Sequence, residues 1–444
     1  TRGGAGTRVG ATPAEGGSGT CLKGGTVMYP EVKLKDEDRD KRRGEIGMTG
    51  SERRYLKTHP WLTFKFDMSG IRADTWILLG EATSKCEHLA RSVMPPAFAQ
   101  ELNKIYVERG ALGTTAIEGN TLTEREVREI MEGRDRVPPS RAYQKQEIEN
   151  VISLFNDVVN ECVTTDSAPF SARRLKDFHA TLLKGQPLKE GVVPGEFRTH
   201  SVTVGSYAGA PAEDCEYLVD YLCQWLNDEL AAAQADKTVM RTPRIFVLAV
   251  LAHLYLAWIH PFGDGNGRMA RLLEFDLLLR AGVPLPAAHL LSDHYNKTRD
   301  MYYAVLAEAS RRPPHYQAEK VIRYAIEGLV DGLREQIGRV TALHESVMWQ
   351  SYVTDAFRSM PQTKARLRQR DVALALPPGK WTTLGEVLIL TPEVAEQYRG
   401  LTSKAVSRDL NELAKLNLVE RKRGLGVRPL SEIMTSFRPP RVEF

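Results

Sequence analysis

The sequence predicts a mainly α-helical protein with one small β-hairpin in its central part and a small module of helices and strands at its C-terminal end. Apolar residues recur at three- and four-residue spacing through most of residues 74–258, as on one face of a helix. In the first 380 residues, only the segment 198–207 alternates apolar and polar side chains as a half-buried strand does. After Pro377-Pro378-Gly379, helical spacing is followed by two short strand-like runs.

The composition is that of a globular chain. Its 444 residues are enough for two or three domains, since one domain usually takes about 100–200 residues. The 60 Lys and Arg nearly balance the 56 Asp and Glu, and 42% of the residues are apolar, which argues against a largely disordered protein. The longest apolar-rich run, 245–259, is shorter than the ~20 residues of a bilayer span, so we expect no membrane contact. Five scattered Cys without a C-x-x-C pair argue against disulfides and a cysteine zinc site, and fit a cytoplasmic location.

The chain divides into regions by composition. The first 25 residues hold nine Gly and no aromatic side chain, and the following stretch is dense in charge, so we expect a loosely ordered tail. Because the chain begins with Thr, Met28 and Met48 are alternative starts. The predicted regions are a tail over 1–57, an N-terminal helical region over 58–140, a central domain over 141–312, a helical linker over 313–380 and a C-terminal module over 381–444.

Helices are predicted in order from Asp74 onward. The first has Leu78, Ala82 and Cys86 on one face, and a second is expected over 96–118. Thr123 and Glu126 have the spacing of a capping box, which opens a third helix. Further helices are expected over 143–161, 171–183, 213–232 and 243–258.

The segment from His260 to Arg271 carries the clearest chemistry. Pro261 ends the preceding helix, a loop with three glycines follows, and a new helix is expected to begin near Asn266 or Gly267. Glycines let backbone N–H groups approach a ligand closely, and a helix N-terminus favours an anion. Arg268 and Arg271, three residues apart, project from one helix face and suit bidentate contacts to phosphate.

Two further groups of this segment complete a reactive site. Asp264 can hold a Mg²⁺ that bridges phosphate oxygens, and a neutral His260 can take a proton from a hydroxyl. Each feature alone has an ordinary structural explanation: a helix-end His, a turn or calcium-type loop, a solvated Arg face. Their combination within twelve residues favours a phosphoryl- or nucleotidyl-transfer site.

These residues match the signature HPFx[DE]GNGRxxR, so the sequence resembles the Fic family from about residue 58 to 310. The resemblance implies a mainly helical Fic catalytic domain over 141–312 that transfers AMP from Mg-ATP to a Ser, Thr or Tyr hydroxyl of a target protein. The kinase-like Doc branch departs from GNGR at this loop, so AMP transfer is favoured. The implied roles are His260 as base, Phe262 as loop anchor, Asp264 as metal ligand, Gly265, Asn266 and Gly267 as anion hole, and Arg268 and Arg271 as phosphate ligands.

Two other segments resemble parts of that family. Arg198 with Val202 and Val204 resembles the flap, a hairpin that docks the target by strand addition; the alternative is an ordinary surface hairpin. Tyr302 and Tyr303 lie where the family places aromatic residues beside adenine; the alternative is a helix core.

An inhibitory segment is expected at residues 114–119. Thr114 and Glu118 match the Fic inhibitory motif [S/T]xxxE[G/N], which implies that Glu118 pairs with Arg271 within the same chain. A carboxylate there would occupy the place of the γ-phosphate and repel ATP. The alternative is an exposed acid at a helix end. In some relatives the same Glu supports AMP removal, so the reverse reaction stays open.

The C-terminal module resembles a winged helix-turn-helix. Helices are expected over 393–399 and 402–416, followed by strands over 418–422 and 427–430. If the module binds DNA, Lys404, Ser407 and Arg408 would face the major groove, and Arg421, Lys422 and Arg423 would face phosphates. Contact with a protein or a second copy of the chain is the alternative.

The leading hypothesis is therefore a self-inhibited protein adenylyltransferase that uses ATP and Mg²⁺ on a target hydroxyl, its own included. The alternatives are a de-AMPylase that uses the same site and a DNA-binding regulator that senses nucleotide. The intact His260 favours an enzyme, since sensing alone needs no base. A homodimer is a further expectation drawn from the resemblance.

Overall fold

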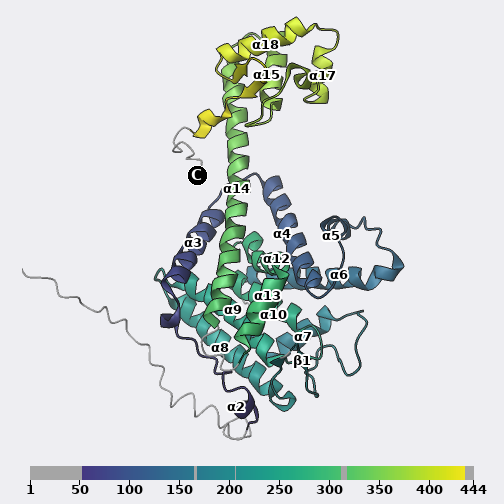
Figure 1. Ribbon diagram of the computed structural model, residues 1–444, viewed down its shortest axis with the longest axis vertical. Coiled ribbons are helices and arrows are strands. Elements are labelled where there is room, and N and C mark those ends of the chain that lie inside the picture. The colour runs from purple at the N-terminus through teal and green to yellow at the C-terminus, as the bar shows by residue number, and fades with distance from the viewer. Residues whose placement is uncertain (1–52, 165–167, 206, 312–317, 436–444) are drawn as a thin grey trace, which may run out of the picture. The chain divides into compact units, whose positions relative to one another are not determined.

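The computed structural model describes residues 53–164, 168–205, 207–311 and 318–435, and it is mainly α-helical, as the sequence predicts (Figure 1). The N-terminal part begins with a single helical turn, α2, and continues through the four helices α3 to α6. The capping box between Thr123 and Glu126 is confirmed at the start of α5. The helices here are α2 Tyr55–Thr58, α3 Ala73–Ala90, α4 Pro96–Ala116, α5 Glu124–Met131 and α6 Ala142–Val163.

The central part is built around α9, Arg241–Ile259, whose residues are buried without a break from Ile245 to Leu256. By length and composition this helix is apolar enough to cross a membrane, and 83% of its most apolar window is buried inside the protein. It packs against α10 and α8 (Figure 1). The other helices of this part are α7 Ala172–Leu182, α8 Cys215–Ala235, α10 Asn266–Arg280, α11 Leu285–Ala288, α12 Leu290–Lys297 and α13 Arg299–Ala309.

The predicted hairpin is present as two short antiparallel strands. Strand β1, Thr203–Val204, pairs with β2, Tyr207–Ala208, with Val204 opposite Tyr207. Single 3₁₀ turns complete this body at Met68–Gly70, Pro139–Arg141 and Ala212–Asp214.

The predicted helical linker over 313–380 is wrong for the first half of helix α14, Ala318–Arg358, which belongs to the core. This half buries Ile322, Ala325, Leu329 and Leu333 in the same hydrophobic core as α9 and α10. These residues follow the three- and four-residue spacing of a buried helix face, so this part of the chain is core and not a connection. The second half contributes Trp349, Val353 and Phe357 to a separate C-terminal core.

The C-terminal module therefore begins before residue 381. Its core joins α14 residues to Val372 of α15, Leu410 of α18 and Val427 of β4. Strands β3 and β4 form an antiparallel hairpin, and Thr382 bridges to Val427 at its edge. The elements are α15 Lys364–Ala375, α16 Leu384–Val387, α17 Pro392–Tyr398, α18 Ser403–Lys415, β3 Val419–Lys422, β4 Gly426–Pro429 and a 3₁₀ turn at Ser431–Thr435.

The predicted tail also ends earlier than residue 57. Residues 1–52 lie outside the described residues, but Tyr55 is buried and its N–H donates to Asp214 Oδ2 at 2.8 Å. The aromatic ring of Tyr55 lies against Tyr217, which gives this end of the described chain a packed contact that the charge-dense sequence around it does not suggest.

Candidate functional site

A cavity of about 840 Å³ is lined by seven of the predicted site residues. His260 reaches it from the end of α9, and Gly267 and Arg271 reach it from α10. Glu118 reaches it from the turn after α4, and Tyr303 from α13. Val204 and Tyr207 of the hairpin form another part of its wall. Segments far apart in the chain thus meet where the sequence predicts the reaction.

His260 sits in a strained turn at the end of α9. Its φ of 51° and ψ of 57° are left-handed, which is uncommon for a residue other than Gly. The turn is held by Arg198, whose Nε donates to the carbonyl of His260 at 2.7 Å. The backbone N–H of Arg198 also donates to the carbonyl of Pro261 at 2.9 Å.

The predicted target-docking role is wrong for Arg198. Its side chain is buried, and its other nitrogens donate to the carbonyls of His200 and Ala210 at 2.7 and 2.5 Å. A buried guanidinium whose N–H groups donate to backbone carbonyls cannot also bind a target protein. Val202 is half-buried, whereas Val204 on β1 is exposed.

The His260 ring has the tautomer and charge of a base. Nδ1 lies 3.3 Å from the carbonyl of Ala257, and because a carbonyl only accepts, Nδ1 carries the proton. Nε2 therefore presents its lone pair. Burial lowers the pKa of His260 below its ordinary value of 6.5, so the ring is neutral near pH 7.

The loop after His260 is fixed by its own side chains. The amide of Asn266 accepts from the N–H of Phe262 at 2.9 Å and donates to the carbonyl of Phe262 at 2.8 Å. Both ends of the Asn266 side-chain amide are therefore hydrogen-bonded to Phe262, so only the backbone N–H of Asn266 is available for the predicted anion hole. Helix α10 begins at Asn266 as predicted, and its first intrahelical bond runs from Met269 to Gly265. The N–H groups of Asn266, Gly267 and Arg268 precede that bond and belong to the anion-binding end of the helix.

His179 of α7 supports the loop, and sequence reasoning missed it. Its ring stacks on Phe262 with centroids 3.9 Å apart. Nε2 donates to the carbonyl of Asp264 at 3.0 Å, and Nδ1 accepts from the N–H of Gly195 at 3.0 Å. Burial lowers the pKa of His179 to about 4, so it stays neutral. A lone His on a helix face carried no signal of this role in the sequence.

Asp264 lies at the edge of the loop with its side chain 33% exposed. Its Oδ1 accepts from the N–H of Gly265 at 2.6 Å, and Lys189 and Arg268 lie 3.6 and 3.5 Å from its oxygens. Within the described residues, no group of three or more His, Cys, Asp or Glu could hold a metal alone. One carboxylate beside the predicted phosphate-binding loop fits Mg²⁺, which usually takes one or two carboxylates and completes its shell with phosphate oxygens and water.

Arg271 is buried and fully engaged. Nε donates to Thr114 Oγ1 at 2.8 Å, and Nη2 donates to the carbonyl of Thr114 at 2.9 Å. Nη2 also donates to Glu118 Oε1 at 2.7 Å, and Nη1 to Tyr302 Oη at 3.2 Å. Burial opposes the charge, but the Tyr302 hydroxyl and Glu118 outweigh it and raise the pKa of Arg271 above its ordinary value.

Glu118 is the carboxylate that meets Arg271 in the cavity. Burial alone would raise its pKa, but attraction to Arg271 and their hydrogen bond hold the pKa below its ordinary value. Gly267 makes room for it, because a Cβ at that position would collide with Glu118 Oε1. The pairing that the sequence predicted between Glu118 and Arg271 is thus present in the structure.

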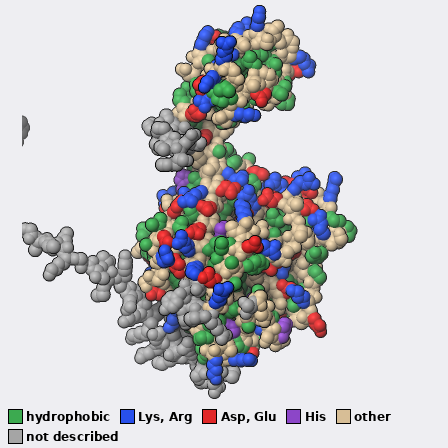
Figure 2. Space-filling model, in the orientation of Figure 1, with side chains coloured by type: hydrophobic (Ala, Val, Ile, Leu, Met, Phe, Trp, Pro, Cys, Tyr) green, Lys and Arg blue, Asp and Glu red, His purple; other side chains and the backbone are tan. Residues whose placement is uncertain are grey.

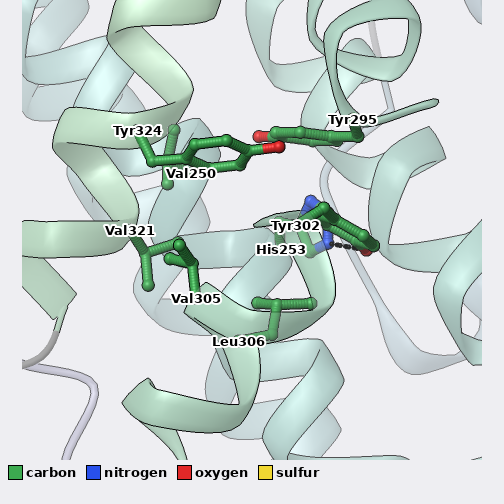
Figure 3. Close-up of a pocket in the computed structure, with 8 residues that line it drawn as sticks. All are labelled: Val250, His253, Tyr295, Tyr302, Val305, Leu306, Val321 and Tyr324. Carbon is green, nitrogen blue, oxygen red and sulfur yellow. Dashed lines mark hydrogen bonds between the residues drawn. The ribbon is translucent and has the colours of Figure 1, made fainter. Parts of the chain in front are cut away.

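Behind Arg271, Tyr302 belongs to a buried polar network. His253 Nε2 lies 3.0 Å from Tyr302 Oη, and Nδ1 lies 3.3 Å from Glu274 Oε2. Tyr295 donates to the other oxygen of Glu274 at 2.9 Å and stacks on Tyr302. Figure 3 shows Tyr302 and Tyr295 on the same side of a small cavity, with His253 bonded to Tyr302. Tyr302 therefore also holds Arg271, while Tyr303, 43% exposed, lines the large cavity and donates to the carbonyl of Ile117.

In the C-terminal module, the residues predicted to contact DNA lie on α18. Lys404 and Arg408 are exposed and Ser407 is half-buried. Arg421 is half-buried and bonded to the carbonyl of Ser407 and to Asn411, so it is less available for phosphates than predicted. In Figure 2, Lys and Arg side chains are scattered over this module with acidic side chains among them.

Comparisons with known proteins find a family match in the central part of the chain. The model of the Fic/DOC family matches residues 169–278. The protein adenylyltransferase fic-1 of Caenorhabditis briggsae is 30% identical over 227 residues, 50% of this chain and 40% of that protein. The protein adenylyltransferase Fic of Drosophila ananassae is 33% identical over 171 residues, 38% and 32% of the two chains. The solved Fic-1 fragment of Caenorhabditis elegans is 23% identical with a TM-score of 0.48, over 65% and 76% of the two chains. The chain spans about two fifths or less of the length of these two curated relatives.

Proposed function

We propose that this chain, whose residues 169–278 form a Fic/DOC-family domain, is a protein adenylyltransferase that moves AMP from ATP to a hydroxyl of a target protein. The observation that carries the proposal is one cavity in which His260, the start of α10 and Arg271 meet. Relatives named protein adenylyltransferase support the same activity.

The cavity residues divide the work of the transfer. His260 Nε2 takes the proton of a target Ser, Thr or Tyr hydroxyl, and the hydroxyl oxygen forms a bond to the α-phosphorus of ATP. The bond from that phosphorus to the bridging oxygen breaks, and pyrophosphate leaves with the electron pair. The N–H groups of residues 266–268 hold the charged phosphate oxygens, and Arg268 and Arg271 hold the outer phosphates.

Asp264 is the residue that would hold Mg²⁺ together with the ATP phosphates. The ion would neutralise part of the phosphate charge. The remaining groups of the loop act without it: they orient the nucleotide and place its α-phosphorus near His260.

Glu118 would act as an intramolecular brake. It accepts a hydrogen bond from Nη2 of Arg271, the arginine assigned to the γ-phosphate, and its negative charge opposes ATP. The Thr114 and Tyr302 contacts keep Arg271 in place when Glu118 is absent. Glu118→Gly should therefore free a preformed phosphate site rather than disrupt it.

Intact-mass spectrometry of the full chain with Mg-ATP tests these assignments. We expect an AMP adduct in Glu118→Gly, at least about 10-fold more than in the wild type, since one charged hydrogen bond contributes roughly 1.5–3 kcal/mol. Glu118→Gly/His260→Ala should form none. A phosphate adduct would indicate kinase-like chemistry instead, and equal adducts with and without Glu118 would contradict the brake.

The reverse reaction is a second candidate because the Glu118 carboxylate faces the cavity with its side chain 31% exposed. There it could align a water for removal of AMP. The wild type and Glu118→Gly would be incubated without ATP on the adduct that Glu118→Gly forms. Release of AMP by the wild type alone would support this reaction, and release by neither would exclude it for that substrate.

DNA contact remains a separate proposal that depends on Lys404 and Arg408, both exposed on α18. Lys404→Ala/Arg408→Ala should weaken binding to duplex DNA and lower its salt dependence, as loss of phosphate contacts does. Unchanged binding would place the DNA site elsewhere. Self-association and cytoplasmic location remain predictions.

A further inference from the structure

Arg268, the first arginine of α10, is held by a carboxylate that the sequence did not single out. Its Nη1 donates to Glu147 Oε1 of α6 at 2.5 Å, and the two residues lie 121 positions apart. Both are buried, with 8% and 7% of their surfaces exposed. Nη2 of Arg268 lies 3.5 Å from Asp264 Oδ1, on the side of the reaction loop. Glu147 thus supports one end of a guanidinium whose other end faces the phosphate-binding loop.

Asn120 connects this support to the inhibitory turn. Its Nδ2 donates to Glu147 Oε2 at 2.9 Å and to the carbonyl of Gln144 at 3.0 Å. Its Oδ1 accepts from the N–H of Leu122 at 3.0 Å. Asn120 follows Glu118 by two residues, so one turn reaches both arginines: Glu118 contacts Arg271 directly, and Asn120 reaches Arg268 through Glu147.

We propose that Glu147, itself anchored by Asn120, is a positioning residue that sets the orientation of Arg268 for phosphate binding. The inference rests on the proposed function, because it assigns Arg268 to the ATP phosphates. An arginine binds phosphate well when its planar N–H donors already have the orientation that the phosphate requires. A buried carboxylate that accepts from Nη1 of Arg268 fixes this orientation.

The hydrogen-bond pattern makes Glu147→Gln a sharp test. Both oxygens of Glu147 accept, one from Arg268 and one from Asn120. A glutamine has one accepting and one donating end, so it would point an NH₂ group either at Arg268 or at the NH₂ group of Asn120. The substitution keeps the size of the side chain and removes one of its two contacts.

The experiment uses the full chain in the Glu118→Gly background, with calorimetry for the ATP dissociation constant and kinetics for AMP transfer. We expect Glu147→Gln to raise the dissociation constant and the KM for ATP about 10-fold, as loss of one charged hydrogen bond does. The kcat at saturating ATP should fall by less than about 3-fold, since the reacting groups remain. Asn120→Ala, which leaves the ion pair, should raise the dissociation constant about 3-fold.

Asp276→Asn is the matched control. Asp276 lies on α10, the helix of Arg268, and forms a buried pair with Arg174 at 2.5 Å, while its other oxygen accepts from Arg280 at 2.7 Å. It should lower the melting temperature as Glu147→Gln does, with ATP affinity changed by less than about 2-fold. Equal losses of affinity in both variants would mean that Glu147 only stabilises the fold, and would overturn the proposal.

The remaining outcomes are also decisive. Unchanged ATP affinity in Glu147→Gln would overturn the proposal, and if that variant does not fold, unchanged affinity in Asn120→Ala would do the same. Absence of ATP binding in Glu118→Gly itself would overturn both this inference and the proposed function. ATP binding without AMP transfer would overturn the proposed function alone, because the dissociation constant still reports on Arg268.

Discussion

Of the arginines that are buried against a carboxylate, one in each hydrophobic body forms a contrast with the other, because the two pairs differ in what surrounds them. In the central body, Arg271 meets Glu118 at 2.7 Å. In the C-terminal module, Arg368 meets Asp409 at 2.6 Å. The side chain of Glu118 is 31% exposed and faces a cavity of about 840 Å³, whereas that of Asp409 is fully buried.

The difference lies in whether the carboxylate can be replaced. Asp409 also accepts hydrogen bonds from Gln369 at 2.9 Å and from the Tyr398 hydroxyl at 3.2 Å, so no anion from solution can take its place. Glu118 borders an open cavity, and in the proposed function a phosphate of ATP enters there and displaces it. On that proposal, a buried ion pair is a regulatory contact only where a second anion can reach the arginine, and is otherwise part of the fold.

The largest contrast should be in stability. Asp409→Ala leaves Arg368 buried without its carboxylate and should destabilise the C-terminal module by about 3–5 kcal/mol. Glu118→Gly should change the free energy of unfolding by no more than about 1 kcal/mol, because Arg271 keeps its bonds to Thr114 and Tyr302 and water can enter the space that Glu118 leaves beside the cavity. Urea denaturation of both variants, followed by hydrogen exchange in each body, measures the difference. Similar losses in the two variants would remove the distinction between the pairs.

Arg198 is a third kind of buried arginine, because its guanidinium donates to backbone carbonyls and not to a carboxylate. Arg198→Lys keeps the charge but cannot make the forked contacts to His260, His200 and Ala210, so the His260 turn should relax. In the Glu118→Gly background we expect kcat to fall about 10-fold with the KM for the target unchanged. The exposed Arg173→Lys is the control. A higher KM for the target with kcat preserved would instead restore the docking role for Arg198.

The smallest expected contrast is in acid sensitivity. Burial lowers the pKa of His179 to about 4 and that of His289 to about 3, below the ordinary 6.5. Below pH 6.5 these two histidines bind protons in the unfolded chain but not in the folded chain. The stability that they contribute to the folded chain above pH 6.5 is therefore lost as the pH falls toward 4. Each histidine should cost on the order of 1 kcal/mol by pH 5.5.

The C-terminal module serves as the internal control for this pH effect, because residues 345–444 contain no His. Scanning calorimetry of the full chain between pH 7.5 and 5.5 should show the central body losing stability while the module changes little. Parallel losses in both bodies would show that buried histidines are not the cause.

Much of the fold was predictable because its signals are local. The helix starts at Glu124 and Asn266 depend on a capping box and on a glycine loop, which neighbouring residues form among themselves. The first half of α14 was interpreted as a linker although its apolar spacing is regular. Helical spacing predicts a buried face, but not which partner covers it.

The supporting residues of the site were not predictable in the same way. Glu147 and His179 contact the loop across 121 and 85 positions, and each lies on a helix that carries other polar side chains. The docking role given to Arg198 failed for a related reason. An arginine beside a hairpin can face solvent or the backbone beneath it, and the packing of α9 decides that it caps the His260 turn.

The sequence by itself determined the candidate reactive loop of this protein, because His260, Asp264 and the two arginines lie within twelve residues and the chemistry predicted for them follows from residue type and spacing. It also determined the helical class through the period of its apolar residues. Only the tertiary structure decided which carboxylate holds which arginine. The open space beside Glu118 and the complete burial of Asp409 both arise from helices that are distant in the chain.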